Sequence, residues 1–120
     1  MSALQEEFLQ SAAKLILKVP EFGYTATAGE LWRTPEQAQW NADHHLGVSH
    51  SLHMDRLAID LLVFVNGVYQ TDDSSGCYTK LGEWWEALSS PIPGAKYMWG
   101  GRFAIVDYDH FSLSPDGIRG

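Results

Sequence analysis

Apolar residues near the start of the chain recur at the spacing of an α-helix. Those on the predicted buried side are Leu4, Phe8, Ala12, Leu15, Ile16 and Val19. Pro20 and Gly23 follow and end the pattern, so a helix is predicted up to Val19. A second helix is predicted after the capping residues Ser74 and Ser75, and its apolar stripe consists of Tyr78, Leu81, Trp85 and Leu88.

A different pattern, typical of a β-strand, occupies residues 57–65. This segment is rich in branched and apolar side chains, and Asn66-Gly67 follows it as a hairpin-type turn. In a strand, Asp60 shares a face with Ala58 and Leu62. Asp60 is thus an ionisable group within an apolar segment, where a buried carboxylate needs a partner such as a metal ion. Pairing with Arg56 or with the backbone is the alternative.

Shorter patterns complete the predicted secondary structure. Thr34 and Pro35 are typical of a helix start, with threonine as cap and proline in the first turn. Extended segments are predicted over residues 25–32, 97–103 and 110–113. Helices at the front and middle with strands around them indicate the α+β class, a small and mostly antiparallel sheet with flanking helices. The 120 residues are expected to form a single domain, 1–120.

Composition narrows the range of partners. The net charge of −7 argues against nucleic acid, because its binding needs a basic surface. The single cysteine, Cys77, excludes a disulfide within the chain and a cysteine-based zinc site. The first residues lack the features of a signal peptide, and no segment is long and apolar enough to span a membrane. We therefore expect a product of the cytoplasm that does not insert into membranes.

Polar residues suited to metal binding occur in two short segments. His53 and Asp60 lie in the first, and Asp107 and His110 lie near the C-terminus. Two imidazoles and one carboxylate can hold zinc and leave a fourth position for water, which is the arrangement of a catalytic site. A carboxylate beside that water can take its proton. This pattern predicts a zinc hydrolase.

Other residues are alternatives for these roles. The loop before the first segment contains three further imidazoles, His44, His45 and His50. Adjacent histidines often mark solvated loops, although histidine is the commonest metal ligand. Asp109 is the alternative to Asp107 as base, but in an extended chain it points away from its neighbour His110. Trp99 is expected at the wall of the cleft as a substrate contact, with a place in the core as the alternative.

The order of the motifs also carries information. The pattern S-x-H-x(6)-D runs from Ser51 to Asp60, an aromatic and glycine stretch follows, and D-x-x-H runs from Asp107 to His110. In this order the chain resembles peptidase family M15, and the matching segments are residues 29–37, 51–62, 81–85 and 99–111. That family contains D-alanyl-D-alanine carboxypeptidases and dipeptidases and the L-alanyl-D-glutamate endopeptidases of phages. The resemblance implies a Hedgehog/DD-peptidase-like fold.

The resemblance also implies roles for individual residues. The zinc ligands would be His53, Asp60 and His110, and Asp107 would be the catalytic base. Arg33, in an R-T-x-x-Q context, resembles the arginine that holds the substrate and the developing oxyanion; a surface salt bridge is its alternative. Ser51 resembles a serine that contacts the substrate or a ligand. The family often has glycine where this chain has Arg56, so the mouth of the site is expected to differ.

The activity that the resemblance implies is zinc-dependent hydrolysis of peptidoglycan. The Asp-x-x-His motif, the small size and the absent signal favour a phage-type endolysin that cleaves the L-Ala–D-Glu bond of the stem peptide. Such a protein would be made in the host cytoplasm, be released with the help of a holin, and act on the wall as a monomer. The alternatives are a D,D-carboxypeptidase or dipeptidase of the same family, and a metal-bound wall-recognition module without catalysis.

Overall fold

The computed structural model describes residues 2–32, 34–44, 52–118 and 120. Four residues named above, Arg33, His45, His50 and Ser51, lie outside the described residues. The elements in chain order are α1 (Ser2–Glu21), β1 (Thr25–Ala28), α2 (Pro35–Asp43), β2 (Ala58–Val65), β3 (Val68–Tyr69), α3 (Cys77–Glu86), β4 (Lys96–Trp99), the short 3₁₀ helix η1 (Gly100–Arg102) and β5 (His110–Ser114).

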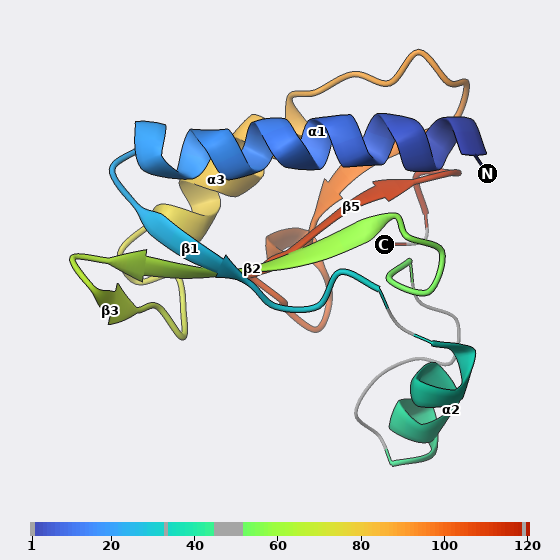
Figure 1. Cartoon of the computed structure of the whole chain (residues 1–120), viewed down its shortest axis with the longest axis horizontal. Coiled ribbons are helices and arrows are strands. Elements are labelled where there is room, and N and C mark those ends of the chain that lie inside the picture. The colour runs from blue at the N-terminus through green and yellow to red at the C-terminus, as the bar shows by residue number, and fades with distance from the viewer. Residues whose placement is uncertain (1, 33, 45–51, 119) are drawn as a thin grey trace.

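The strands form one small sheet in the order β1-β2-β5-β4, and β3 also pairs with β2. Every described strand pair is antiparallel. Figure 1 shows α1, in dark blue, crossing one face of the sheet with α3 near it, whereas α2 stands apart from this body. The predicted α+β class, with a small antiparallel sheet and flanking helices, is confirmed.

The core lies where α1 and α3 cover the sheet. Ile59, Phe111 and Trp99 are direct neighbours across β2, β5 and β4, and all three side chains are buried. The predicted stripe of α1 is confirmed for Phe8, Ala12, Leu15 and Val19, which are buried in the same cluster, but Ile16 is exposed. The helix also continues through Pro20 to Glu21, beyond its predicted end at Val19. Burial of one such side chain contributes about 1.5–3 kcal/mol. The interior is therefore occupied mainly by apolar packing, and the side chains suited to metal binding lie on the other face of the sheet.

The alternation of side chains along β2 puts Asp60 on that other face. Ile59 and Leu61 point into the core, so Asp60 between them points away from it. In the neighbouring strand β5, His110 is the direct partner of Asp60. The strand predicted over 57–65 is thus confirmed, and its register brings together two residues that are far apart in sequence.

One predicted turn and one predicted helix cap are also confirmed. Asn66 and Gly67 join β2 to β3 with φ of 51° and 78°, the left-handed conformations that a two-residue hairpin turn requires. Thr34 caps α2, because its Oγ1 accepts a hydrogen bond from the backbone N–H of Gln37 at 3.0 Å. None of the described helices is long and apolar enough to cross a membrane.

The start of α3 differs from the prediction. Neither Ser74 nor Ser75 occupies the N-cap position, which belongs to Gly76 and has no side-chain bond, although Ser75 Oγ accepts a long hydrogen bond (3.4 Å) from the N–H of Cys77. Instead, Asp73 Oδ1 accepts hydrogen bonds from the backbone N–H groups of Tyr78 (2.9 Å) and Thr79 (3.1 Å). A carboxylate is a stronger acceptor than a hydroxyl and interacts well with the positive end of a helix, which explains the preference for aspartate.

Two predicted strands are shorter than expected. The first ends at Ala28, and the strand predicted over 97–103 ends at Trp99. Gly100 begins the 3₁₀ helix there, and its carbonyl oxygen accepts hydrogen bonds from the N–H groups of Phe103 (3.1 Å) and Asp107 (2.9 Å). The chain therefore folds back at Gly100 instead of continuing along the sheet.

Candidate metal centre

The structure brings together the three residues that the sequence suggested as metal ligands. Asp60 comes from β2, His110 begins β5, and His53 lies in the turn before β2. Asp60 Oδ1 is 3.3 Å from His53 Nε2 and 3.6 Å from His110 Nδ1. One donor atom from each residue lies within 4.8 Å of the others. Both histidines are buried and Asp60 is half-buried.

These separations suit a small tetrahedral ion. With each donor about 2.0–2.1 Å from zinc, two tetrahedral ligands lie about 3.3–3.5 Å apart. The two distances from Asp60 Oδ1 fall in or near that range. This oxygen is also buried without a hydrogen bond to any described residue. A buried carboxylate oxygen that two ring nitrogens face at ligand spacing is the arrangement expected of a metal site.

The outer sides of the two rings favour metal binding as well. His110 Nε2 lies 2.8 Å from the carbonyl oxygen of Gly120. A carbonyl only accepts, so the hydrogen on Nε2 is directed to Gly120, and Nδ1 is the ring nitrogen available to an ion. On the other ring, His53 Nδ1 faces Glu30 Oε1 at 3.8 Å. Metal-binding histidines typically direct their second nitrogen to a carbonyl or carboxylate in this way.

The carboxylate of Asp60 is held in its charged form. Burial alone would raise its pKa, but interactions with His110 and His53 outweigh burial and lower the pKa to about 2. At neutral pH the cluster therefore offers one negative oxygen and two ring nitrogens, a donor set that zinc accepts.

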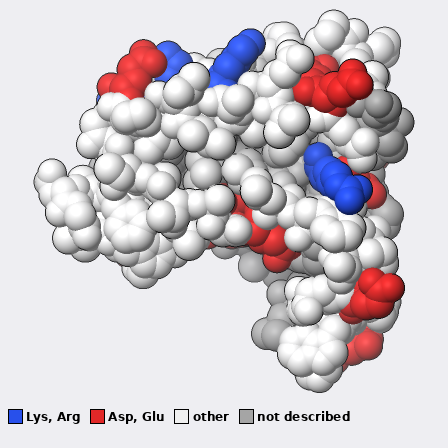
Figure 2. Space-filling view, viewed as in Figure 1, with Lys and Arg blue, Asp and Glu red and all other residues white. Residues whose placement is uncertain are grey.

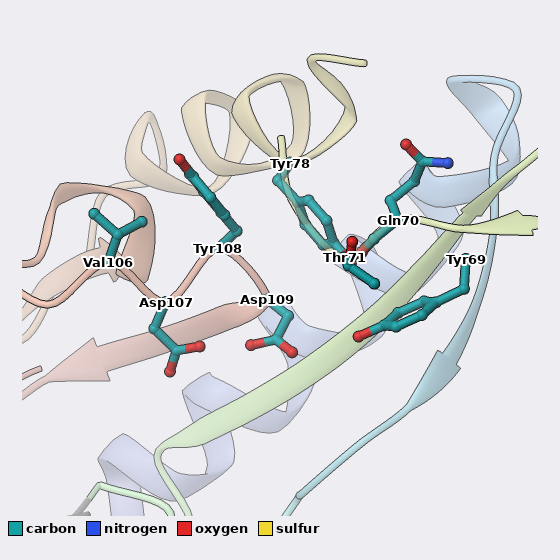
Figure 3. A pocket seen from close by; sticks show the side chains of 8 residues that line it. All are labelled: Tyr69, Gln70, Thr71, Tyr78, Val106, Asp107, Tyr108 and Asp109. Atoms are coloured by element: carbon teal, nitrogen blue, oxygen red, sulfur yellow. Dashed lines mark hydrogen bonds between the residues drawn. The ribbon is translucent and has the colours of Figure 1, made fainter. Parts of the chain in front are cut away.

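Asp107, the predicted base, lies at the rim of this cluster. Its Oδ2 is 3.9 Å from His110 Nδ1, and its side chain is 52% exposed. Asp107 also lines a cavity of about 140 Å³ between the loop before β5 and the segment after β3. Figure 3 shows the carboxylates of Asp107 and Asp109 on the same side of this loop, with the Tyr69 hydroxyl pointing towards them. Water can therefore reach Asp107 beside the metal ligands.

Close backbone packing fixes Asp107 in this place. Its N–H donates to the carbonyl oxygen of Gly100. A Cβ atom at Gly100 would lie 2.0 Å from the carbonyl oxygen of Asp107 and 3.0 Å from His110 Cβ. Only glycine allows the loop to approach β5 so closely.

Asp109 lies nearer to the cluster than the sequence argument suggested. One oxygen each from Asp60, Asp107 and Asp109 lies within 4.8 Å of the others. Residues 108–109 form a turn before β5, so the alternation of an extended chain does not apply to them. Burial raises the pKa of Asp109, and the neighbouring Asp107 and Asp60 carboxylates raise it further, to about 8.

The structure places two other candidates elsewhere. Trp99 is 3% exposed and packs in the core, where its Nε1 donates to the carbonyl oxygen of Tyr108 at 2.7 Å. The expectation that Trp99 lines the cleft is therefore not supported, and the alternative place in the core is the observed one. His44 stacks on Trp40 at the end of α2, with ring centroids 3.9 Å apart. Among the described residues, His44 is not part of a metal-binding group.

Sequence reasoning missed the groups around the ligands. Glu30 and Gly120 contact the outer nitrogens of the histidines only because the folded chain brings distant segments together, and no local pattern marks them. The chain matches no protein-family model and no curated protein sequence. The case for a function therefore depends on the geometry of the site and on the motifs.

Proposed function

We propose that the protein is a zinc-dependent peptidase of peptidoglycan with a fold of the DD-peptidase type. The observation that carries this proposal is the group formed by His53, Asp60 and His110, with Asp107 at its open side. Two imidazoles, one ionised carboxylate and a nearby solvent-exposed carboxylate are the parts that metal-assisted peptide hydrolysis needs.

Each residue of the site has a separate role in this proposal. A bound zinc ion would supply Lewis-acid chemistry, polarising the scissile carbonyl and making water more acidic. His53 Nε2, Asp60 Oδ1 and His110 Nδ1 would hold that ion. Asp107 accepts the proton of the attacking water and passes it to the leaving amine. Arg33, assigned from the motifs alone, would grip the substrate and stabilise the oxyanion. Ser51, also assigned from the motifs, would contact the substrate or a metal ligand.

The motifs further favour one bond. The Asp-x-x-His form of the second motif supports an endolysin that cleaves between L-alanine and D-glutamate in the stem peptide. In this proposal the protein acts on the wall as a monomer, after release from the host cytoplasm with the help of a holin.

Digestion of purified peptidoglycan tests the proposal directly. The zinc-loaded protein should release peptides with a new N-terminal D-glutamate, identified by mass analysis of the muropeptides. Free D-alanine as the only product would instead favour the D,D-carboxypeptidase. The absence of any product from protein with stoichiometric zinc would favour a recognition module without catalysis. His110→Ala, tested in parallel, should give no product.

A further inference from the structure

An apolar pocket between the first turns of α1 and the turn that carries His53 has no part in the mechanism above. It encloses about 360 Å³ and is lined by Gln5, Glu6, Phe8, Leu9, Leu31, Trp32 and Arg56. Leu9, Leu31 and Trp32 remain 70%, 54% and 44% exposed. Large apolar side chains that gather around one hollow and stay in contact with solvent are typical of a binding surface.

The pocket shares a wall with the turn that carries His53. Trp32 Nε1 donates a hydrogen bond to the carbonyl oxygen of Met54, and Gln5 Nε2 donates one to that of Asp55, both at 3.0 Å. Arg56 closes the same turn, because its N–H donates to the carbonyl oxygen of His53 at 3.2 Å. A molecule in this pocket would therefore lie against the turn that carries His53.

Arg56 is the one basic side chain in this lining. Its guanidinium carbon lies 4.5 Å from the centre of the Trp32 ring, and its φ of 58° is uncommon for a residue other than glycine. Among the described residues, no acidic side chain forms an ion pair with it. An unfavourable backbone conformation thus presents an exposed, unpaired cation at the pocket, and such outliers often mark functional positions.

Arg102 provides a comparison, because it is an arginine of the same molecule that has an acidic partner. It too stacks on a tryptophan, at 5.2 Å from the Trp99 ring, but its guanidinium forms an ion pair with Glu86 at 3.2 Å. Basic side chains are few in this chain, whose net charge is −7, and few are visible on the face shown in Figure 2. A guanidinium without an acidic partner is therefore unusual here. The lining also contains the acidic Glu6, so it is the guanidinium of Arg56, and not the pocket as a whole, that offers charge complementarity to a carboxylate.

We propose that this pocket receives a peptide residue that carries both an apolar group and a carboxylate. The carboxylate pairs with Arg56, whose forked donors suit it, and the apolar group packs against Leu9 and Leu31. Gln5 and Glu6 add polar groups to the wall, which suit a peptide better than a hydrocarbon chain. The identification of this residue as part of the substrate rests on the proposed function, whereas its binding to the pocket does not.

The test uses a pair of probes that differ only in charge, N-acetyl-L-leucine and its amide. The full chain, with and without added zinc, is titrated with each probe while the ¹H–¹⁵N signal of the Trp32 indole is followed by NMR. The signal is identified by its loss in Trp32→Phe. The carboxylate probe should shift it saturably and bind about tenfold more tightly than the amide, the scale of one charge-assisted hydrogen bond.

Arg56→Gln should abolish that preference, whereas the matched control Arg102→Gln should keep it. The indole signal of Trp85, which is buried and donates to the carbonyl oxygen of Ser112, reports that each variant is folded. Equal binding of both probes, an unmoved Trp32 signal, or a preference that persists in Arg56→Gln would overturn the proposal.

The outcome is separate from that of the peptidoglycan digestion. If the wall is not cleaved but the preference depends on Arg56, the proposed function fails and the binding site remains. If the wall is cleaved but Arg56 makes no difference to either probe, the pocket proposal alone is wrong.

Discussion

Individual side chains of the metal centre are oriented by their second contacts. The Gly120 carbonyl fixes which nitrogen of His110 faces Asp60, and Glu30 lies behind the ring of His53. One nitrogen of each ring faces the Asp60 carboxylate, at 3.3 and 3.6 Å, so the ligands would need little rearrangement to hold an ion. Asp107 stands outside this group and remains accessible to solvent.

The position of Asp107 leads to a prediction for catalysis. Asp107→Asn removes the proton acceptor but none of the three ligands, so activity should fall by about 100-fold or more while zinc is retained. The rate of peptide release from peptidoglycan and the zinc content per chain measure the two effects. Asp109→Asn is the comparison, because its carboxylate lies in the same cluster. If Asp109→Asn abolishes turnover and Asp107→Asn has a mild effect, the base has been misassigned.

Among the secondary-structure elements, the contact between α3 and β4 depends on a glycine. A Cβ atom at Gly82 would lie 2.1 Å from the ring of Trp99, which is buried and cannot move freely. Gly82→Ala should therefore lower the free energy of unfolding by about 1–3 kcal/mol through overpacking, in spite of the better helix propensity of alanine.

Urea denaturation measures this effect. Glu83→Ala, at the exposed next position of α3, is the matched control and should change stability by less than about 0.5 kcal/mol. A Gly82→Ala variant as stable as the wild type would contradict this prediction. It would show that Trp99 can shift to make room for a methyl group between α3 and β4.

Local sequence patterns predicted most helices and strands, but they could not predict the contacts between these elements. The stripe of α1 and the Asn66-Gly67 turn are set by neighbours in sequence, and both were found where expected except that Ile16 is exposed. The pairing of Asp60 with His110 depends on strand register, which the residues in either strand do not specify alone. The motifs named the ligands, yet only the fold shows the contacts of His53 with Glu30.

For the whole molecule, one polar network ties α1 to the sheet. The Tyr97 hydroxyl donates to Glu7 Oε2 at 2.6 Å and lies 2.7 Å from Ser11 Oγ. Burial, together with the hydrogen bond to Glu7, raises the pKa of Tyr97 from 10.0 to about 12. The hydroxyl therefore keeps its proton in the folded state at pH values where the unfolded chain has lost it.

This difference predicts how stability responds to alkali. Below pH 10 the Tyr97 hydroxyl is protonated in both the folded and the unfolded state, and its full contribution to the free energy of unfolding is present. As the pH rises from about 10 to about 12, the unfolded state releases this proton first, and stability falls. Tyr97→Phe should be less stable at neutral pH but should show a smaller loss over that range. Urea midpoints between pH 8 and 12 measure this, and an unchanged slope would show that Tyr97 does not titrate as described.

The central claim is that three residues from distant parts of the chain hold one zinc ion, and metal analysis of purified protein tests it most directly. About one zinc per chain is expected, because three protein ligands and water complete a tetrahedral site. His53→Ala, Asp60→Ala and His110→Ala should each lose the metal, while His44→Ala, at the exposed histidine of α2, should keep it. Stoichiometric zinc that survives all three ligand substitutions would contradict the account and direct attention to His44, His45 and His50.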